Sequence, residues 1–255
     1  PSPQIKIYSI SLKDEKDGVL SDFFNSDSIV AKLSLWSLLK GNIVIDKIIF
    51  EDLTINLENY PNKNPNWVFY KKENKLELDS NNFNDAHAKF NQVKYPNIKI
   101  NEYAITKGKI IYNKDSKINL KDILITKNNN ADIIKGVINI DGINFSLNSS
   151  FIKKNKIEKI WKSSLSLINK DIKIITKGNI NINNNYPGLE GSLDISSDQL
   201  SKLSKSYNYL NLLDNRFKLI SELSLSLESN NLLYSIYNLS INSGPLKFTG
   251  TVSGN

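Results

Sequence analysis

The chain lacks cysteine and methionine entirely and has one histidine among its 255 residues. Without cysteine it cannot form disulfides, thiol nucleophiles, iron–sulfur clusters or cysteine-ligated zinc. The lone His87 has no second imidazole with which to build a multi-histidine metal site. It lies in a polar segment, and we interpret it as an exposed loop residue. We therefore expect no catalytic residues, no metal site and no cofactor.

Sequence motifs of nucleotide and hydrolase chemistry are also missing. The chain has no phosphate-binding G-x-x-x-x-G-K-[ST] loop, no dinucleotide fingerprint and no Gly-x-Ser-x-Gly elbow. Arginine is limited to Arg216, although 33 Lys+Arg against 26 Asp+Glu give a formal net charge of +7. Because the lysines are spread along the chain and arginine is the preferred phosphate reader, we expect no nucleic-acid partner.

Long hydrophobic runs are absent as well. No stretch approaches the ~18 apolar residues of a membrane span, and no signal peptide is recognisable. The chain begins with Pro1-Ser2-Pro3 rather than methionine, so we expect a fragment of a longer protein. Any membrane anchor would lie outside this fragment.

What the chain does contain is alternation of apolar and polar residues at period two. Leu53, Ile55 and Leu57 alternate with polar residues, and the same rhythm recurs to Phe248. Spacers such as Asp141-Gly142 are typical hairpin turns. The pattern predicts about fifteen short strands in a mainly β, mostly antiparallel sheet. A closed barrel, a two-sheet sandwich and an elongated, curved trough all fit it.

Helices are predicted at two places only. Residues 196–213 carry apolar residues at helical spacing behind a capping box that starts at Ser196. Residues 36–41 read as one helical turn that ends at Gly41. We interpret 1–255 as a single region, with a possible subdivision into 1–75 and 93–255.

Several segments in the first seventy residues are similar to a known family. A leucine-rich turn at 36–41 follows the apolar segment 29–35, and the strands 43–50 and 53–58 precede the pair Asn66-Trp67. In order and spacing these pieces resemble the N-terminal region of the AsmA family of bacterial envelope proteins. The segments 189–200 and 223–250 resemble later strand units of the same family. Residues 71–188 share only the alternation of apolar and polar residues with it.

The resemblance implies the membrane-proximal periplasmic part of a protein anchored in the bacterial inner membrane. Such proteins are similar to bridge-like lipid-transfer proteins, whose β-groove has an apolar floor. Phospholipid would be the ligand, envelope proteins possible partners, and outer-membrane biogenesis the process served.

From the alternation and this resemblance we expect ten residues to line a groove for acyl chains. They are Leu53, Ile55, Leu57, Ile98, Ile100, Ile138, Ile140, Leu223, Leu225 and Leu227. On pattern alone the same residues could form a sealed core. A structural or regulatory scaffold that binds envelope proteins and carries no lipid is the alternative function. A glycan-cleaving enzyme is a third, since a carboxylate pair could come from any two strands.

Overall fold

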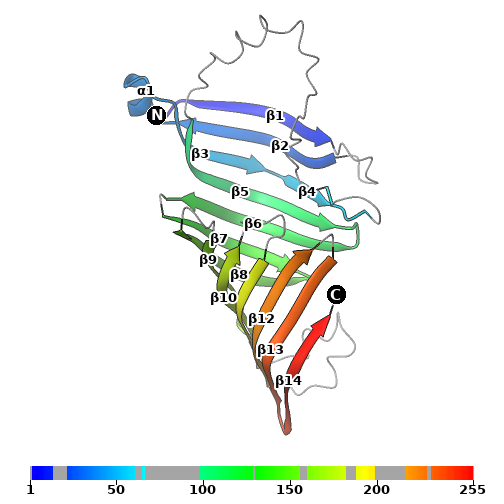
Figure 1. Ribbon diagram of the computed structural model, residues 1–255. Coiled ribbons are helices and arrows are strands. Elements are labelled where there is room, and N and C mark those ends of the chain that lie inside the picture. Colours follow the sequence, from blue (N-terminus) through cyan, green and yellow to red (C-terminus); the bar gives the residue numbers. More distant parts are fainter. Residues whose placement is uncertain are drawn as a thin grey trace, which may run out of the picture.

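The structure is a computed structural model that describes most of the chain. The described residues are 2–13, 22–60, 65–66, 98–128, 130–155, 160–181, 188–198, 216–228 and 231–254. They form one fourteen-stranded sheet and, within these ranges, a single short helix (Figure 1). This confirms the predicted mainly β fold with a mostly antiparallel sheet and very little helix.

The first part of the sheet contains the strands β1 to β6, and the helix α1 lies between two of them in the chain. Its elements are β1 (Gln4–Lys13), β2 (Asp22–Leu33), α1 (Leu35–Leu39), β3 (Val44–Glu51), β4 (Leu53–Leu57), β5 (Lys99–Tyr112) and β6 (Ser116–Lys127). Helix α1 ends where the sequence predicts, since Gly41 has a φ of 75° that favours glycine. The strands β5 and β3 pair in parallel, as do β5 and β4, so the sheet is mixed at this point.

The second part is an uninterrupted antiparallel meander. Its strands are β7 (Ala131–Ile140), β8 (Ile143–Asn155), β9 (Ile160–Ile168), β10 (Ile172–Asn181), β11 (Gly188–Ser197), β12 (Phe217–Glu228), β13 (Asn231–Ser243) and β14 (Leu246–Gly254). The turn between β7 and β8 is the predicted Asp141-Gly142, and both residues have positive φ angles of 49° and 83°. Such angles match a tight hairpin turn and set the register Ile140–Ile143.

The sheet is open. Within the described residues β1 pairs only with β2, and β14 pairs only with β13, so the two ends of the sheet do not join. The strand pairs with extensive contacts are all neighbours in the sheet, and no second layer of described strands covers either face. The described part of the chain is therefore neither a closed barrel nor a sandwich.

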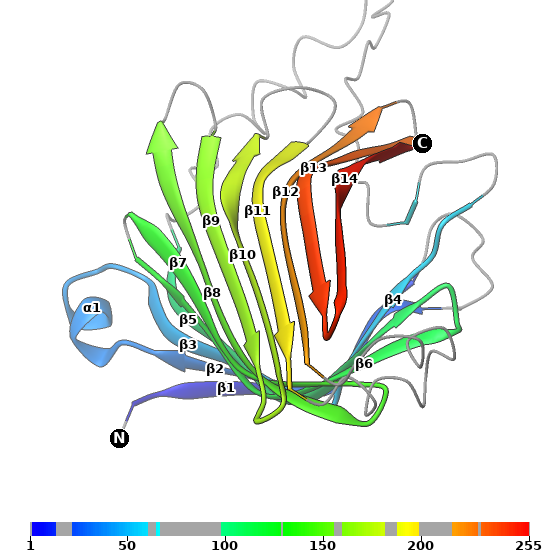
Figure 2. The same cartoon turned by 90° about the horizontal axis from the view of Figure 1, so that it is seen from below.

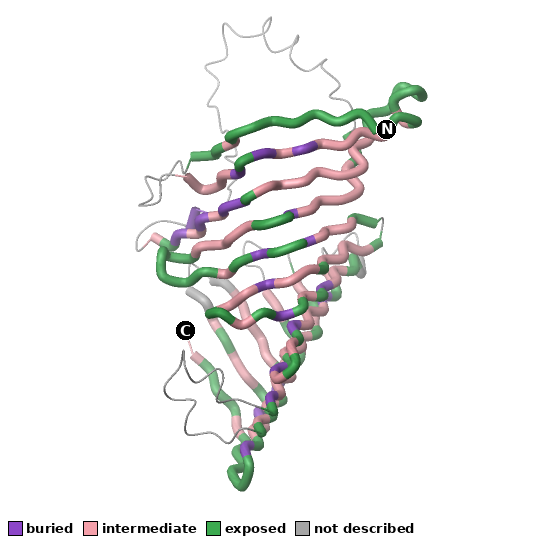
Figure 3. Tube along the Cα trace, turned by 180° about the vertical axis from the view of Figure 1, so that it is seen from behind, coloured by how far each residue is buried: buried purple, intermediate pink, exposed green. Residues whose placement is uncertain are grey.

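The sheet is strongly twisted and curved. In Figure 1 the strands β1 to β6 run across the view, whereas β12 to β14 run steeply. Seen from below in Figure 2, the strands from β8 to β13 lie close together at one end and spread toward the other. Figure 3 shows that buried residues are spread along many strands rather than gathered in one compact centre.

The structure differs from the sequence interpretation at the helix predicted from Ser196 and at the suggested boundary between 1–75 and 93–255. Ser196 pairs with Lys173 and Lys218 inside β11, so the predicted helix does not begin there. The strand continues because its alternating residues pair on both sides, which outweighs a local capping pattern. Residues 199–215 lie outside the described part. The suggested boundary between 1–75 and 93–255 falls where β5 pairs with β3 and β4, so one sheet spans both segments.

Candidate functional site

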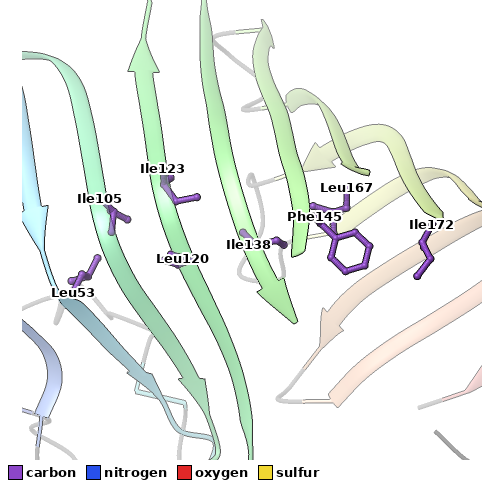
Figure 4. Packing of buried hydrophobic residues seen from close by; sticks show 8 residues of the cluster. All are labelled: Leu53, Ile105, Leu120, Ile123, Ile138, Phe145, Leu167 and Ile172. Atoms are coloured by element: carbon purple, nitrogen blue, oxygen red, sulfur yellow. The ribbon is translucent and has the colours of Figure 1, made fainter. Parts of the chain in front are cut away.

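The best-packed side chains form one elongated cluster that crosses the strands β4 to β10. Its buried members are Leu53, Ile105, Leu120, Ile123, Ile138, Phe145, Leu167 and Ile172 (Figure 4). Ile138 pairs directly with Leu120 on one side and with Phe145 on the other. Because directly paired residues share a face of a sheet, the cluster defines one face, which we call the apolar face.

Burial distinguishes this face from the opposite one. From β5 to β13, strand register places every buried residue that the structure describes on the apolar face. These residues are Ile105, Leu120, Ile123, Ile138, Phe145, Ser149, Ser163, Leu167, Ile172, Ser197, Ser221, Leu239 and Ser243. Side chains converge on the inner side of a curved sheet and diverge on its outer side. The apolar face is therefore the concave side.

Charge is excluded from the apolar face over its second half. Among the described strand residues from β9 to β14, register and alternation place no Asp, Glu, Lys or Arg on it. The charged residues of these strands are on the opposite face. Those whose side chains the structure describes are Lys162, Lys173, Lys177, Glu190, Asp194, Lys218, Glu222 and Lys247. A sheet face free of charge, with no described layer over it, suits apolar ligands rather than polar chemistry.

Two serine hydroxyls on the apolar face donate hydrogen bonds to the backbone. The Ser149 hydroxyl donates to the Ser164 carbonyl oxygen at 2.8 Å, and the Ser163 hydroxyl donates to the Gly178 carbonyl oxygen at 3.3 Å. Their hydrogen-bonding capacity is thus used within the sheet. With Gly178 and Gly191, these small residues keep the floor of the apolar face low across β8 to β11.

The burial of side chains on the apolar face varies along the strands. Ile172, near the β9–β10 turn, is 2% exposed, and Ser243, next to the β13–β14 turn, is fully buried. Toward the other end of the same strands burial decreases, and Tyr234 is 37% exposed. The apolar face is thus enclosed at one end of β8 to β13 and open at the other, as the spreading strands of Figure 2 indicate.

A charged rim borders the apolar face at the end of β3 and β5 to β8 that lies nearest to α1. Its members by register are Asp46, Lys99, Lys127, Asp132 and Lys153. The Lys127 ammonium lies 5.0 Å from the ring centre of Tyr103, and that of Lys153 lies 5.9 Å from the Trp161 ring. Because each of these ammonium groups lies over an aromatic ring, the charged rim is amphipathic where it meets the apolar face.

A line of irregular residues changes which residues reach the apolar face. Leu120 and Ile123 both belong to the cluster although they are three residues apart, because Asp122 between them has a φ of 50°. Asp52, with a φ of 48°, has the same effect between Phe50 and Leu53. At Asp122 the register toward β7 shifts, as at a β-bulge, whereas the pairing around Asp52 stays in register; at both positions the alternation reverses.

The structure brings most of the predicted groove residues together. Leu53 and Ile138 are in the cluster, Ile55 and Ile140 pack against it, and register places three more on the same face: Leu57, Leu223 and Leu225. Ile100 lies on the opposite face, because it is five regularly paired residues before Ile105. Ile98 precedes β5, is 50% exposed and is outside the cluster. The side chain of Leu227 lies outside the described residues.

Other apolar-face residues were not among the ten. Phe145, Leu167 and Ile172 carry the same alternating signal in the sequence, so the pattern could have found them. Ile105 and Ile123 could not be assigned to a face in this way, because the alternation reverses at the positive-φ residues Asp52 and Asp122.

Charged side chains on the opposite face form hydrogen bonds and ion pairs with residues of neighbouring strands. Glu51 accepts hydrogen bonds from the Ser28 hydroxyl and from the Lys6 ammonium, the latter at 3.1 Å. These two bonds, that from Ser28 first, lower the pKa of Glu51 below its ordinary value. Lys47 and Glu102 form a second ion pair at 3.6 Å. These exposed pairs stabilise the sheet locally and do not form a catalytic arrangement.

No group of three metal-ligating side chains occurs among those that the structure describes. No helix in the described ranges is long and apolar enough to cross a membrane. His87 lies outside the described part of the chain. Comparison with protein-family models, curated proteins and solved structures finds no match for this chain.

Proposed function

We propose that this chain holds or conducts phospholipid acyl chains along its apolar face. The observation that carries the proposal is the charge-free concave face from β9 to β14, which no described layer covers. We further propose that it acts on the periplasmic side of the bacterial inner membrane and supports outer-membrane biogenesis without enzymatic chemistry. The AsmA-like segments of the sequence support this setting.

The physical benefit of such a face is large. Exposing a sixteen-carbon chain to water costs roughly 12 kcal/mol, at about 0.8 kcal/mol per methylene. A barrier of about 20 kcal/mol for a two-chain lipid would limit transfer to roughly one event in a hundred seconds. Ile174, Ile195 and Leu219, which stand in one row across β10 to β12, offer apolar contact in place of water.

The small residues Ser163, Gly178 and Gly191 form a further row on the same face, separated from it by the row that contains Thr176 and Leu193. A low floor flanked by branched aliphatic side chains is a shape that an extended acyl chain fills. No cofactor is needed, because the work is to exclude water rather than to break a bond.

The test is a photo-crosslinking amino acid placed at Leu225 or, as a control, at the adjacent Ser226. Both are half-buried in β12, and the alternation points them to opposite faces. We expect phospholipid to be captured in cells at Leu225 and far less at Ser226. Equal capture at both positions, or none at either, would contradict the proposal.

A scaffold that binds envelope proteins remains the second candidate. It is favoured by the two open edges of the sheet, where β1 and β14 have exposed apolar residues such as Ile7 and Phe248, 55% and 54% exposed. Unpaired edges can accept a strand from another protein. Protein crosslinks at β14, with no lipid at Leu225, would favour this function.

A further inference from the structure

Helix α1 has an inverted distribution of polar and apolar residues. Leu35, Trp36, Leu38 and Leu39 are all exposed, Trp36 at 75% and Leu39 at 71%, and no residue of the helix is buried. The polar Ser37 is more covered than any of them. A helix at the surface of a water-soluble domain normally turns its leucines inward, so α1 presents its apolar side outward.

Hydrogen bonds hold α1 in this position. The Ser37 hydroxyl donates to the Ser34 hydroxyl at 3.1 Å, and the Ser34 amide donates to the Val44 carbonyl at 2.9 Å. The Asn42 amide donates to the Ser37 carbonyl at 2.8 Å, which closes the connection from α1 to β3. The exposed leucines are therefore displayed by a braced turn, and Figures 1 and 2 show α1 projecting beyond the strands.

The chain segment that contains α1 carries charge of one sign. From Ser28 to Ile45 the chain has no Asp or Glu but has Lys32 and Lys40. Lys99, which is exposed, lies beside this segment, since its amide donates to the Ile43 carbonyl at 3.4 Å. The nearest carboxylate along the chain after the helix, Asp46, is hydrogen-bonded to Asn101 at 3.5 Å.

We propose that α1 and the adjoining Ile43 form a docking tip that inserts into the interface of an anionic lipid bilayer. Indole and leucine side chains favour the boundary between headgroups and acyl chains, and lysines beside them are attracted to anionic lipids. A protein groove would also accept leucines, but the combination of Trp36 with lysines that form no ion pair among the described residues favours the lipid surface. The contact does not require that the apolar face carry lipid.

The experiment compares the 255-residue chain with two double variants in sedimentation with vesicles. The vesicles are phosphatidylcholine with or without phosphatidylglycerol. Trp36→Ser with Leu39→Ser removes the tip, whereas Ile220→Ser with Tyr237→Ser removes an exposed apolar pair on the opposite face of β12 and β13, 43% and 45% exposed. Since α1 has no buried residue, the tip variant should unfold in urea at the same midpoint as the parent chain.

We expect the parent chain to bind the anionic vesicles, with the tip variant binding them about tenfold more weakly or worse. The opposite-face variant should bind like the parent, and Lys40→Gln should reduce the preference for phosphatidylglycerol. Absence of vesicle binding by the parent, as for a tip that contacts a protein, would overturn the proposal. So would equal binding by the tip variant and the parent, or an equal loss in the opposite-face variant. Crosslinking at Leu225 reports on the apolar face independently of these results.

Discussion

Gly178 and Gly191 are direct cross-strand partners in the middle of the β10–β11 ladder, on the apolar face. A Cβ atom built on Gly178 would lie 2.1 Å from the Glu190 carbonyl oxygen, and one on Gly191 would lie 2.2 Å from that of Lys177. Both obstacles are backbone atoms, which cannot rotate away. The close approach of these two strands therefore requires residues without side chains.

Gly178→Ala should consequently destabilise the fold, by about 1 to 3 kcal/mol if the strands separate locally. Gly188→Ala is the matched control in the same ladder, because its Cβ would meet only the Leu225 carbonyl, at 3.4 Å. Urea unfolding of the two variants measures the difference. Equal midpoints would show that the sheet adapts to a methyl group at Gly178 without cost.

Ser221 and Ser149 should respond in opposite directions to the loss of a hydroxyl. Both are buried on the apolar face, but the Ser221 hydroxyl has no hydrogen-bond partner among the described residues, whereas Ser149 donates to Ser164. An unpaired buried hydroxyl costs about 1 to 3 kcal/mol. Ser221→Ala should raise the urea midpoint and Ser149→Ala should lower it. A loss of stability in both variants would mean that Ser221 has a partner.

The pKa of Glu51 should rise toward its ordinary value in Ser28→Ala, since the Ser28 hydroxyl is the first cause of its lowering. A carboxyl with a lower pKa in the folded chain than in the unfolded chain stabilises the fold above its unfolded pKa. That stability is lost as the pH falls through the folded pKa. Ser28→Ala should therefore weaken the dependence of unfolding on acid pH.

A carbon-detected NMR titration of the Glu51 carboxyl measures this shift directly. Ser224→Ala, on the same sheet face but on the distant strand β12, serves as the control and should leave the titration unchanged. An unaltered Glu51 titration in Ser28→Ala would assign the lowered pKa to Lys6 instead.

Ile105 and Ile100 test the assignment of faces on β5. They are five residues apart in a regularly paired strand and so point to opposite sides of the sheet. With a photo-crosslinker at each position, we expect lipid capture at Ile105 and little at Ile100. Capture at Ile100 alone would place the lipid on the wrong face and contradict the proposed path.

Alternation in the sequence was enough to predict strands, turns and the apolar character of one face. The segments around Ile138 and Leu223 follow this alternation, because successive side chains of a strand point to opposite faces of the sheet. Asp141-Gly142 marks a turn, because both residues tolerate positive φ. The same reasoning assigned Ile100 to the groove and fails there. Alternation is only defined within a regular strand, and the positive-φ residues Asp52 and Asp122 reverse it.

The amino-acid sequence by itself therefore determined the strand class of this protein, its hairpins and the absence of charge along alternate positions from β9 to β14. Backbone preferences and the alternation of side chains depend on residues that are close in the sequence, so they can be predicted from the sequence. Tertiary structure alone decided that the sheet remains open, which side is concave, and that α1 turns its leucines outward. These properties depend on twist accumulated over fourteen strands and on contacts between distant residues, which no short segment encodes.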